Sequence, residues 1–371
     1  MKPITVTSPL LPPLEDFTAS LEDIWERKWL TNNGTYHRQL EQALCEYLGV
    51  EYISLFSNGT LALVIALQAL ELEGEVITTP YSFVATSHAL LLNKLKPVFV
   101  DVDPDTLNLD PAKVEAAITD KTVGILPVHV YGTPCEHSRL QQVADKHDLK
   151  IIYDAAHAFG VEEKGCSVLN YGDLSILSFH ATKAYSTIEG GAVICHTKEM
   201  KEKLDKLKSF GFDSDIEVSL IAHNAKMNEV QAAFGLATLN IIDDAIAQRK
   251  FVANEYRSQL RGVKGISFPK ELPDVKYNYS YFPVFIDEQE YGESRDSLFS
   301  KLKDSNVLAR RYFYPIITDY AAYKNNPEIE IVSDEISRGI SKKVICLPLH
   351  HELSIADINK IVEICKSENK K

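Results

Sequence analysis

The stretches KIIYDAAH at residues 150–157 and LSILSFHATK at residues 174–183 decide the fold. Each begins with a short apolar run, as in a buried strand, and ends in polar residues that include Asp154 and Lys183. Between residues 52 and 196, five more runs of this kind alternate with longer segments of helical pattern. Strands that are apolar along their whole length, separated by helices, are typical of a mainly parallel sheet with helices on both faces. The sequence therefore predicts an α/β fold whose seven strands are 52–56, 75–79, 97–102, 123–128, 150–154, 174–179 and 191–196.

The sequence predicts two further regions around this sheet. Residues 1–35, with four prolines among the first 13 residues, predict an irregular arm with a short helix. Residues 36–249 form the predicted large α/β domain, in which a helix is expected at 83–92. A helical pattern with few turn formers, from 228 to about 260, predicts one long connecting helix. Residues 250–371 predict a smaller α+β domain with strands at 279–286 and 344–347 and a helix at 293–305.

The composition narrows the function. The chain of 371 residues is 45% hydrophobic and 25% charged, values of a folded globular protein rather than a disordered one. Its net charge of −13 disfavours binding to nucleic acid. No apolar run reaches the roughly 18 residues of a membrane span, and the N-terminus lacks an apolar secretory signal. Six scattered cysteines without a C-x-x-C pair predict reduced thiols and no metal site. We therefore expect a cytoplasmic protein without a nucleic-acid or membrane partner.

In an open parallel sheet, ligands bind beyond the carboxyl ends of the strands. Gly59 and Thr60 follow the first strand and open an apolar helix, whose free N–H groups suit a phosphate, although an ordinary Asn58 N-cap explains this turn equally well. Asp154, which ends the fifth strand, is either a helix N-cap or a charge held against a ligand. Lys183 follows the sixth strand and is a solvated surface cation unless it faces the same pocket. Together, an amine, a carboxylate and phosphate donors are the groups that pyridoxal phosphate needs.

These motifs resemble those of the DegT-type nucleotide-sugar aminotransferases, a branch of the fold-type I pyridoxal-phosphate enzymes. The resemblance runs from WLTNNG at residues 29–34 to CLPLH at residues 346–350. Its most specific pieces are DAAH at 154–157, SFHATK at 178–183 and EGG at 189–191. It implies a fold-type I PLP-transferase fold and pyridoxal 5'-phosphate as the cofactor.

The resemblance also implies a role for each residue at the strand ends. Lys183 would carry the cofactor as a Schiff base, and Asp154 would face the pyridine nitrogen. His157 falls near the phenolic oxygen of the cofactor. Phe83 matches the aromatic residue that stacks on the ring, with a core phenylalanine on a helix as the alternative. The phosphate positions are Gly59, Thr60 and Ser178.

Two more positions connect the resemblance to a partner subunit and to the substrate. In AHNAKMNE at residues 222–229, Asn224 matches a residue that reaches the cofactor phosphate of the neighbouring subunit, which implies a homodimer with shared active sites. The chain departs from the family pattern at Ala222, where glycine is usual, and at Lys226, where arginine is usual. A lysine cannot reproduce a bidentate arginine contact, so the role of position 226 stays open. Tyr314 matches a segment near the substrate, with a buried tyrosine as the alternative.

The implied reaction moves an amino group from L-glutamate to a keto-sugar nucleotide, with Lys183 as general base and acid. SFHATK resembles the form found in members that aminate C4, and residues 3–13 resemble members that make dTDP-4-amino-4,6-dideoxyglucose for surface polysaccharide such as O-antigen. We therefore expect dTDP-4-keto-6-deoxy-D-glucose as the substrate; C3 amination and a UDP- or GDP-sugar are the alternatives. A nicotinamide-dependent oxidoreductase is disfavoured because no G-x-G-x-x-G follows the first strand. A non-catalytic regulator is disfavoured because Lys183 and Asp154 are both present.

Overall fold

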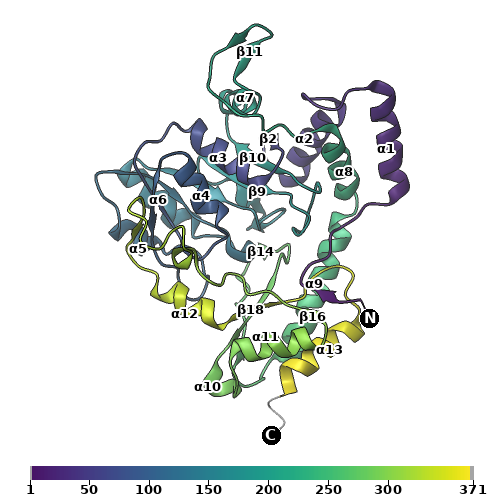
Figure 1. Cartoon of the computed structure of the whole chain (residues 1–371), viewed down its shortest axis with the longest axis vertical. Coiled ribbons are helices and arrows are strands. Elements are labelled where there is room, and N and C mark those ends of the chain that lie inside the picture. The colour runs from purple at the N-terminus through teal and green to yellow at the C-terminus, as the bar shows by residue number, and fades with distance from the viewer. Residues whose placement is uncertain (1, 368–371) are drawn as a thin grey trace.

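A sheet of eight strands forms the centre of the protein (Figure 1). The computed structural model describes residues 2–367. The strands are β2 (Tyr52–Phe56), β3 (Glu75–Thr78), β4 (Lys96–Phe99), β5 (Thr122–Leu126), β6 (Lys150–Asp154), β9 (Leu174–Ser178), β10 (Gly191–Cys195) and β17 (Glu330–Ile331). Their order is β17-β4-β3-β5-β6-β9-β10-β2. Only β10 runs antiparallel to its neighbours in this sheet, so the sheet is mostly parallel, as predicted.

The seven predicted strands are all present, and the sheet contains one strand more. β17 comes from the C-terminal part of the chain and pairs in parallel with β4 at residues 98–99. Its two residues, Glu330 and Ile331, are both exposed. So short a strand without a buried face leaves no hydrophobic pattern in the sequence, which is why it was not predicted.

Helices cover both faces of the sheet and explain the continuous apolar runs. Successive side chains of a strand point to opposite faces. In β6, Ile152 packs in the same cluster as Leu63 of α3 (Gly59–Ala69), whereas Ile151 packs with Leu140 of α6 (His137–His147). Neither face is left to water, so the middle of the strand, Ile151–Tyr153, is a continuous apolar run. The other helices of this part are α2 (Thr35–Leu48), α4 (Ala85–Leu92), α5 (Pro111–Ala116) and α7 (Lys198–Leu207).

The prediction of one long helix from 228 to 260 is wrong. The segment forms α8 (Glu229–Leu239) and α9 (Ile242–Leu260), which meet at an angle of 61°. Ala232 of α8 and Ile242 at the start of α9 lie in the same cluster as α2, whereas Val252, later in α9, lies in the C-terminal cluster. The segment thus packs on two clusters in succession, a tertiary requirement that its local helical pattern does not encode.

The C-terminal part has its own small sheet, of order β13-β15-β18. Its elements are β13 (Ile266–Ser267), β15 (Phe282–Ile286), α10 (Glu288–Tyr291), α11 (Arg295–Asp304), β16 (Val307–Leu308), α12 (Glu335–Lys343), β18 (Val344–Leu347) and α13 (Ile355–Lys366). β1 (Ile4–Thr5) of the N-terminal arm pairs with β16, and α9 crosses the predicted boundary at 249. The division at residues 35 and 249 stays a prediction.

A thin hairpin projects from the large part at the top of Figure 1. It consists of β11 (Phe212–Ser214) and β12 (Glu217–Val218). The N-terminal helix α1 (Leu14–Arg27) packs against α8. The remaining strands β7 (Glu162–Glu163), β8 (Cys166–Ser167) and β14 (Val275–Lys276) form a sheet of order β14-β7-β8. Within residues 2–367, no single helix is long and apolar enough to cross a membrane. The bent pair α8–α9, taken together, has the length and composition of such a span and nothing else in its favour.

Candidate active site

A cavity of about 720 Å³ lies at the carboxyl ends of β6 and β9. Ligand sites usually measure roughly 300–1,000 Å³, so the cavity is large enough for a cofactor or substrate. Its lining includes every predicted site residue except Asn224 and Tyr314, namely Gly59, Thr60, Phe83, Asp154, His157, Ser178 and Lys183. Because β6 and β9 are neighbours in the sheet, the two motifs that decide the fold also meet at this cavity.

Lys183 lies in the turn after β9, with its ammonium 6.0 Å from the centre of the Tyr281 ring. Its side chain lines the cavity, so it is not the solvated surface cation of the alternative interpretation. Burial lowers the pKa of Lys183 from 10.5 to about 8, although the charge of Asp154 opposes this effect. A lysine with a pKa near 8 is partly neutral at physiological pH, and a neutral amine is a nucleophile and a base.

Asp154 ends β6 and is buried. Its Oδ2 accepts a hydrogen bond from the Thr86 hydroxyl at 2.8 Å, and its Oδ1 accepts one from the Ala156 N–H at 3.1 Å. Burial raises the pKa of Asp154, and these two hydrogen bonds act against that effect. Turns rather than a helix follow Asp154, so the helix N-cap interpretation is wrong. The carboxylate instead faces the cavity close enough to Lys183 for their charges to interact.

His157 is buried in the wall of the cavity. Its Nδ1 accepts a hydrogen bond from the backbone N–H of Tyr131 at 3.2 Å, and its ring stacks on Phe313 with centroids 6.0 Å apart. Burial lowers the pKa of His157 well below 6.5, and the nearby Lys183 lowers it further. A neutral imidazole that accepts at Nδ1 carries its proton on Nε2, so His157 is a hydrogen-bond donor at that atom.

At the start of α3, Asn58 is an ordinary helix N-cap, and the same turn also leaves N–H groups that suit a phosphate. Asn58 is the N-cap, and its Oδ1 accepts from the N–H of Leu61 at 2.8 Å. This bond uses the third N–H of the helix and leaves those of Gly59 and Thr60 beside the cavity. A Cβ at Gly59 would lie 2.8 Å from the Ser178 Cβ, and one at Gly191 would lie 2.7 Å from the Gly59 backbone. Glycine at both positions therefore lets the helix start and the strand ends close into a cradle with room for an anion.

Phe83 precedes α4 in a loop and is 61% exposed, so the core-phenylalanine alternative is wrong. The predicted helix at 83–92 begins only at Ala85. An aromatic ring that is exposed on a cavity wall has a free face for stacking.

The structure places the other two predicted residues outside the cavity. Asn224 is exposed, and its Oδ1 accepts a hydrogen bond from the Lys226 ammonium at 2.6 Å. Tyr314 is 39% exposed, which excludes the buried-tyrosine alternative, and the guanidinium of Arg295 lies 4.5 Å from its ring centre. Within one subunit, therefore, neither side chain reaches the residues around Lys183.

The sequence interpretation missed several residues of the site. Thr86 contacts Asp154, and Tyr281, Tyr312 and Phe313 complete the wall from the C-terminal part of the chain. Thr86 stands three residues after Phe83, at helical spacing, which was the available signal. The three aromatic residues lie 98 to 130 residues beyond Lys183, and no local pattern connects them with it.

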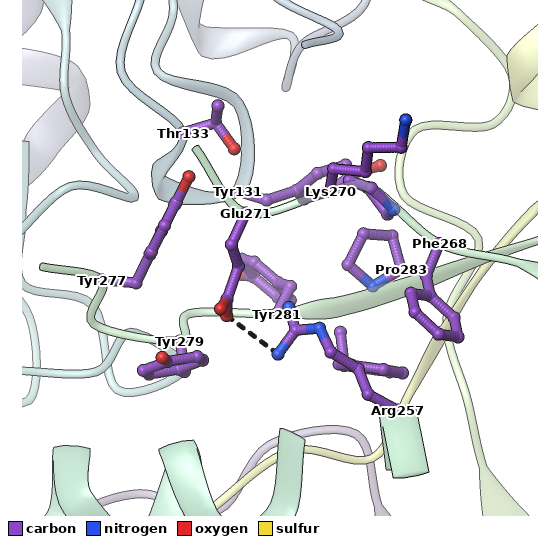
Figure 2. A pocket seen from close by; sticks show the side chains of 12 residues that line it. Tyr131, Thr133, Arg257, Phe268, Lys270, Glu271, Tyr277, Tyr279, Tyr281 and Pro283 are labelled. Carbon is purple, nitrogen blue, oxygen red and sulfur yellow. Dashed lines mark ion pairs between the residues drawn. The ribbon is translucent and has the colours of Figure 1, made fainter. Parts of the chain in front are cut away.

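A second, much smaller depression lies beside this wall (Figure 2). Its volume is about 40 Å³, and Tyr131 and Tyr281 line it together with the ion pair Arg257–Glu271, whose atoms are 2.9 Å apart. A space of that size holds a few water molecules at most. The larger cavity is therefore the candidate active site.

Known proteins resemble this chain over nearly its whole length. Residues 14–366 match the DegT/DnrJ/EryC1/StrS aminotransferase family. The dTDP-4-amino-4,6-dideoxy-D-glucose transaminase of Shigella dysenteriae is 55% identical over 361 residues, which cover 97% of this chain and 98% of that protein. The transaminase of the same name from Escherichia coli is 47% identical, with 98% of each chain covered. Among solved structures, DesI in the presence of its TDP-sugar product has a TM-score of 0.93 and 33% identity, covering 99% of this chain and 93% of that one.

Proposed function

Because the chain belongs to the DegT/DnrJ/EryC1/StrS aminotransferase family, we propose that it is a dTDP-4-amino-4,6-dideoxy-D-glucose transaminase. It transfers the amino group of L-glutamate to C4 of dTDP-4-keto-6-deoxy-D-glucose, and the product serves the synthesis of surface polysaccharide such as O-antigen. The observation that carries the choice of sugar is the identity of 55% and 47% to two transaminases of that name over nearly their full length. The cavity supports the same reaction class, since it combines a buried carboxylate with a lysine whose pKa is about 8.

The residues around the cavity fit pyridoxal 5'-phosphate. Lys183 supplies the amine for a Schiff base, and Asp154 supplies the carboxylate for the ring nitrogen. The cradle at Gly59, Thr60 and Ser178 suits the phosphate because the N–H groups of Gly59 and Thr60 at the helix start lie beside the cavity, which the Ser178 side chain also lines. Phe83 offers a ring face for stacking. When bound there, the cofactor supplies an electron sink that stabilises negative charge on the carbon attached to the migrating nitrogen.

The side chains of this protein divide the remaining work. Lys183, with a pKa near 8, takes a proton from the carbon next to the donor nitrogen and returns a proton to the sugar carbon. The Asp154 carboxylate holds a proton on the ring nitrogen opposite it. The neutral His157 donates from Nε2, and the cofactor's phenolic oxygen is the acceptor that we propose for it. The aromatic wall of Tyr281 and Phe313 limits the access of water to Lys183.

We further propose a homodimer in which Asn224 of each subunit contacts the cofactor phosphate in the other. Two observations support this arrangement. Asn224 lies outside the cavity of its own subunit, and large apolar side chains are exposed in the hairpin and just after it, with Ile216 96% and Ile221 95% exposed. Exposed apolar groups of this kind mark interaction surfaces. Mixing inactive Lys183→Ala with inactive Asn224→Ala should restore activity in heterodimers, up to about a quarter of the wild-type level; no recovery after verified subunit exchange contradicts shared sites.

The substrate is tested by direct assay of the purified protein. With ¹⁵N-labelled L-glutamate and dTDP-4-keto-6-deoxy-D-glucose, we expect ¹⁵N in the sugar product, and NMR should place it at C4. The matched controls are the 3-keto isomer and the GDP- and UDP-linked 4-keto sugars. A kcat/KM higher for any of these than for the dTDP-4-keto sugar would replace the proposed substrate. Absence of ¹⁵N transfer to every sugar, in a protein that holds the cofactor, would overturn the transaminase assignment.

A further inference from the structure

Two buried hydroxyl groups form a series of hydrogen bonds that ends at Asp154. The Thr86 hydroxyl is 2.8 Å from Asp154 Oδ2, and the Ser82 hydroxyl is 2.7 Å from that of Thr86. Thr86 is fully buried, and Ser82 is 5% exposed. The three side chains therefore form a chain of hydrogen bonds that runs from Asp154 through Thr86 to Ser82, which also lines the cavity.

The chemistry of the groups fixes the direction of these bonds. An ionised carboxylate only accepts hydrogen bonds, so Thr86 must donate its single hydroxyl proton to Asp154. The oxygen of Thr86 is then the acceptor in its bond with Ser82, and Ser82 is the donor. The order Ser82 to Thr86 to Asp154 thus directs donors at the carboxylate, and bonds arranged in series polarise one another.

From this geometry we infer that Thr86 is a positioning residue, which holds the Asp154 carboxylate ionised and aimed at the ring nitrogen of the cofactor. The inference rests on the proposed function, because it concerns the site for pyridoxal phosphate. Asp154 needs such support since burial favours its neutral form, and the hydrogen bond from Thr86 is the first of the effects that oppose burial. The Ala156 N–H holds the other oxygen, so the carboxyl plane is fixed from both sides.

The backbone around Thr86 connects this support to the opposite side of the site. The Thr86 N–H donates to the carbonyl of Phe83 at 3.2 Å, and Phe83 lines the cavity. A single tight turn, from Phe83 to the start of α4, therefore sets the positions of the Phe83 ring at the cavity wall and of the Thr86 hydroxyl that bonds Asp154. A substitution that removes the Thr86 hydroxyl and keeps the turn therefore tests the bond to Asp154 without moving the Phe83 ring.

The chain offers a matched control one residue away. Ser87 is also fully buried in α4, but its hydroxyl donates to Tyr323 at 2.8 Å and makes no bond to Asp154. The variants are Thr86→Val, which keeps the branched shape and removes the hydroxyl, Thr86→Ser, which keeps the hydroxyl, and Ser87→Ala. Thr86→Ala replaces Thr86→Val if the valine variant does not fold.

The test compares the dissociation constants of pyridoxal 5'-phosphate and its 1-deaza analogue, in which C–H replaces the ring nitrogen. Both compounds carry the same aldehyde and phosphate, so the ratio of their constants reports on the ring nitrogen alone. A hydrogen bond to a charged group is stronger than one between neutral groups, so we expect Thr86→Val to reduce the preference for the natural cofactor about tenfold or more. Thr86→Ser and Ser87→Ala should keep the wild-type ratio within about twofold.

Each outcome separates this inference from the proposed function. A ratio in Thr86→Val within twofold of wild type, or an equal loss in Ser87→Ala, would overturn the positioning role and leave the proposed function standing. A wild-type protein that binds neither compound at Lys183 would overturn the cofactor site itself and the inference with it. Equal binding of both compounds by the wild type would overturn the inference, because Asp154 would then make no contact specific to the ring nitrogen. A tenfold loss confined to the variants without the Thr86 hydroxyl would support the inference.

Discussion

Replacement of His137 by phenylalanine should remove part of the acid sensitivity of this protein. His137 is 4% exposed, neither of its ring nitrogens has a hydrogen-bond partner, and its ring stacks on Tyr171 with centroids 4.0 Å apart. Burial lowers its pKa from 6.5 to about 4. The unfolded chain therefore binds a proton at this position below pH 6.5, whereas the folded protein does so only near pH 4. Stability is complete above pH 6.5 and is lost as the pH falls toward 4.

The size of the effect follows from these two pKa values. One pH unit corresponds to about 1.36 kcal/mol, so the full interval is worth about 3 kcal/mol, of which about 2 kcal/mol is lost between pH 7.5 and pH 5. Phenylalanine retains the stacking on Tyr171 but binds no proton. The difference in the free energy of unfolding between His137→Phe and wild type should thus shift by about 2 kcal/mol in favour of the variant over this range.

Urea unfolding of the cofactor-free protein at pH 7.5, 6.5, 5.5 and 5.0, at one fixed protein concentration, measures this difference. The exposed His196, replaced by phenylalanine, serves as the control. The nearby His129, whose ring centre is 5.2 Å away, remains in both proteins; because the charge of His137 lowers the pKa of His129, the measured difference includes this coupling. Stability curves for wild type and His137→Phe that stay parallel from pH 7.5 to 5.0 would refute the reasoning.

Three more predictions concern the active site. Lys183→Ala should fold normally, lose the borohydride-reducible attachment of the cofactor and lose turnover; near-normal rates would exclude Lys183 as the proton carrier. Asp154→Asn should stay folded and loaded but be slower by orders of magnitude in both half-reactions, since a close opposite charge moves a pKa by about 1–3 units; a rate within threefold of wild type would contradict it. Lys226→Met should weaken cofactor binding several-fold in equilibrium dialysis. The Lys226 ammonium donates to Asn224 Oδ1, which leaves the amide N–H₂ of Asn224 free to donate to the phosphate of the proposed partner site. Lys226→Arg, which keeps a donor, should bind the cofactor about as well as wild type.

The strand ends of the site could be predicted from the sequence because each lies in a local pattern. Asp154 and Lys183 follow apolar runs that neighbouring parallel strands bring to one edge, and the structure places both in one cavity. The glycine at position 59 was also predictable, since a helix start beside a strand end needs a residue without a side chain. These inferences depend only on the geometry of the chain within about 30 residues.

The remaining features depend on contacts that local patterns do not encode. The segment of α8 and α9 packs on two distant clusters in succession, and its local helical pattern does not encode the bend between the two helices. Tyr281 and Phe313 reach the cavity only after the C-terminal part has docked, and Thr86 was missed because its hydroxyl faces inward, toward a carboxylate 68 residues later. Asn224 lies outside the cavity of its own subunit, so its place at the site depends on the proposed homodimer.

The pairing of β17 with β4 has a consequence for synthesis on the ribosome. β4 ends at Phe99, and the two residues that cover its edge are Glu330 and Ile331, about 230 residues later. Translation proceeds at roughly 5–20 residues per second. The edge of β4 therefore stays unpaired for on the order of 10–50 s, until residues 330–331 have been synthesised. An uncovered edge pairs readily with strands of other chains. Early release of the nascent chain, before residue 331, would therefore leave a sheet prone to aggregation, and a chain truncated after α9 would share that defect.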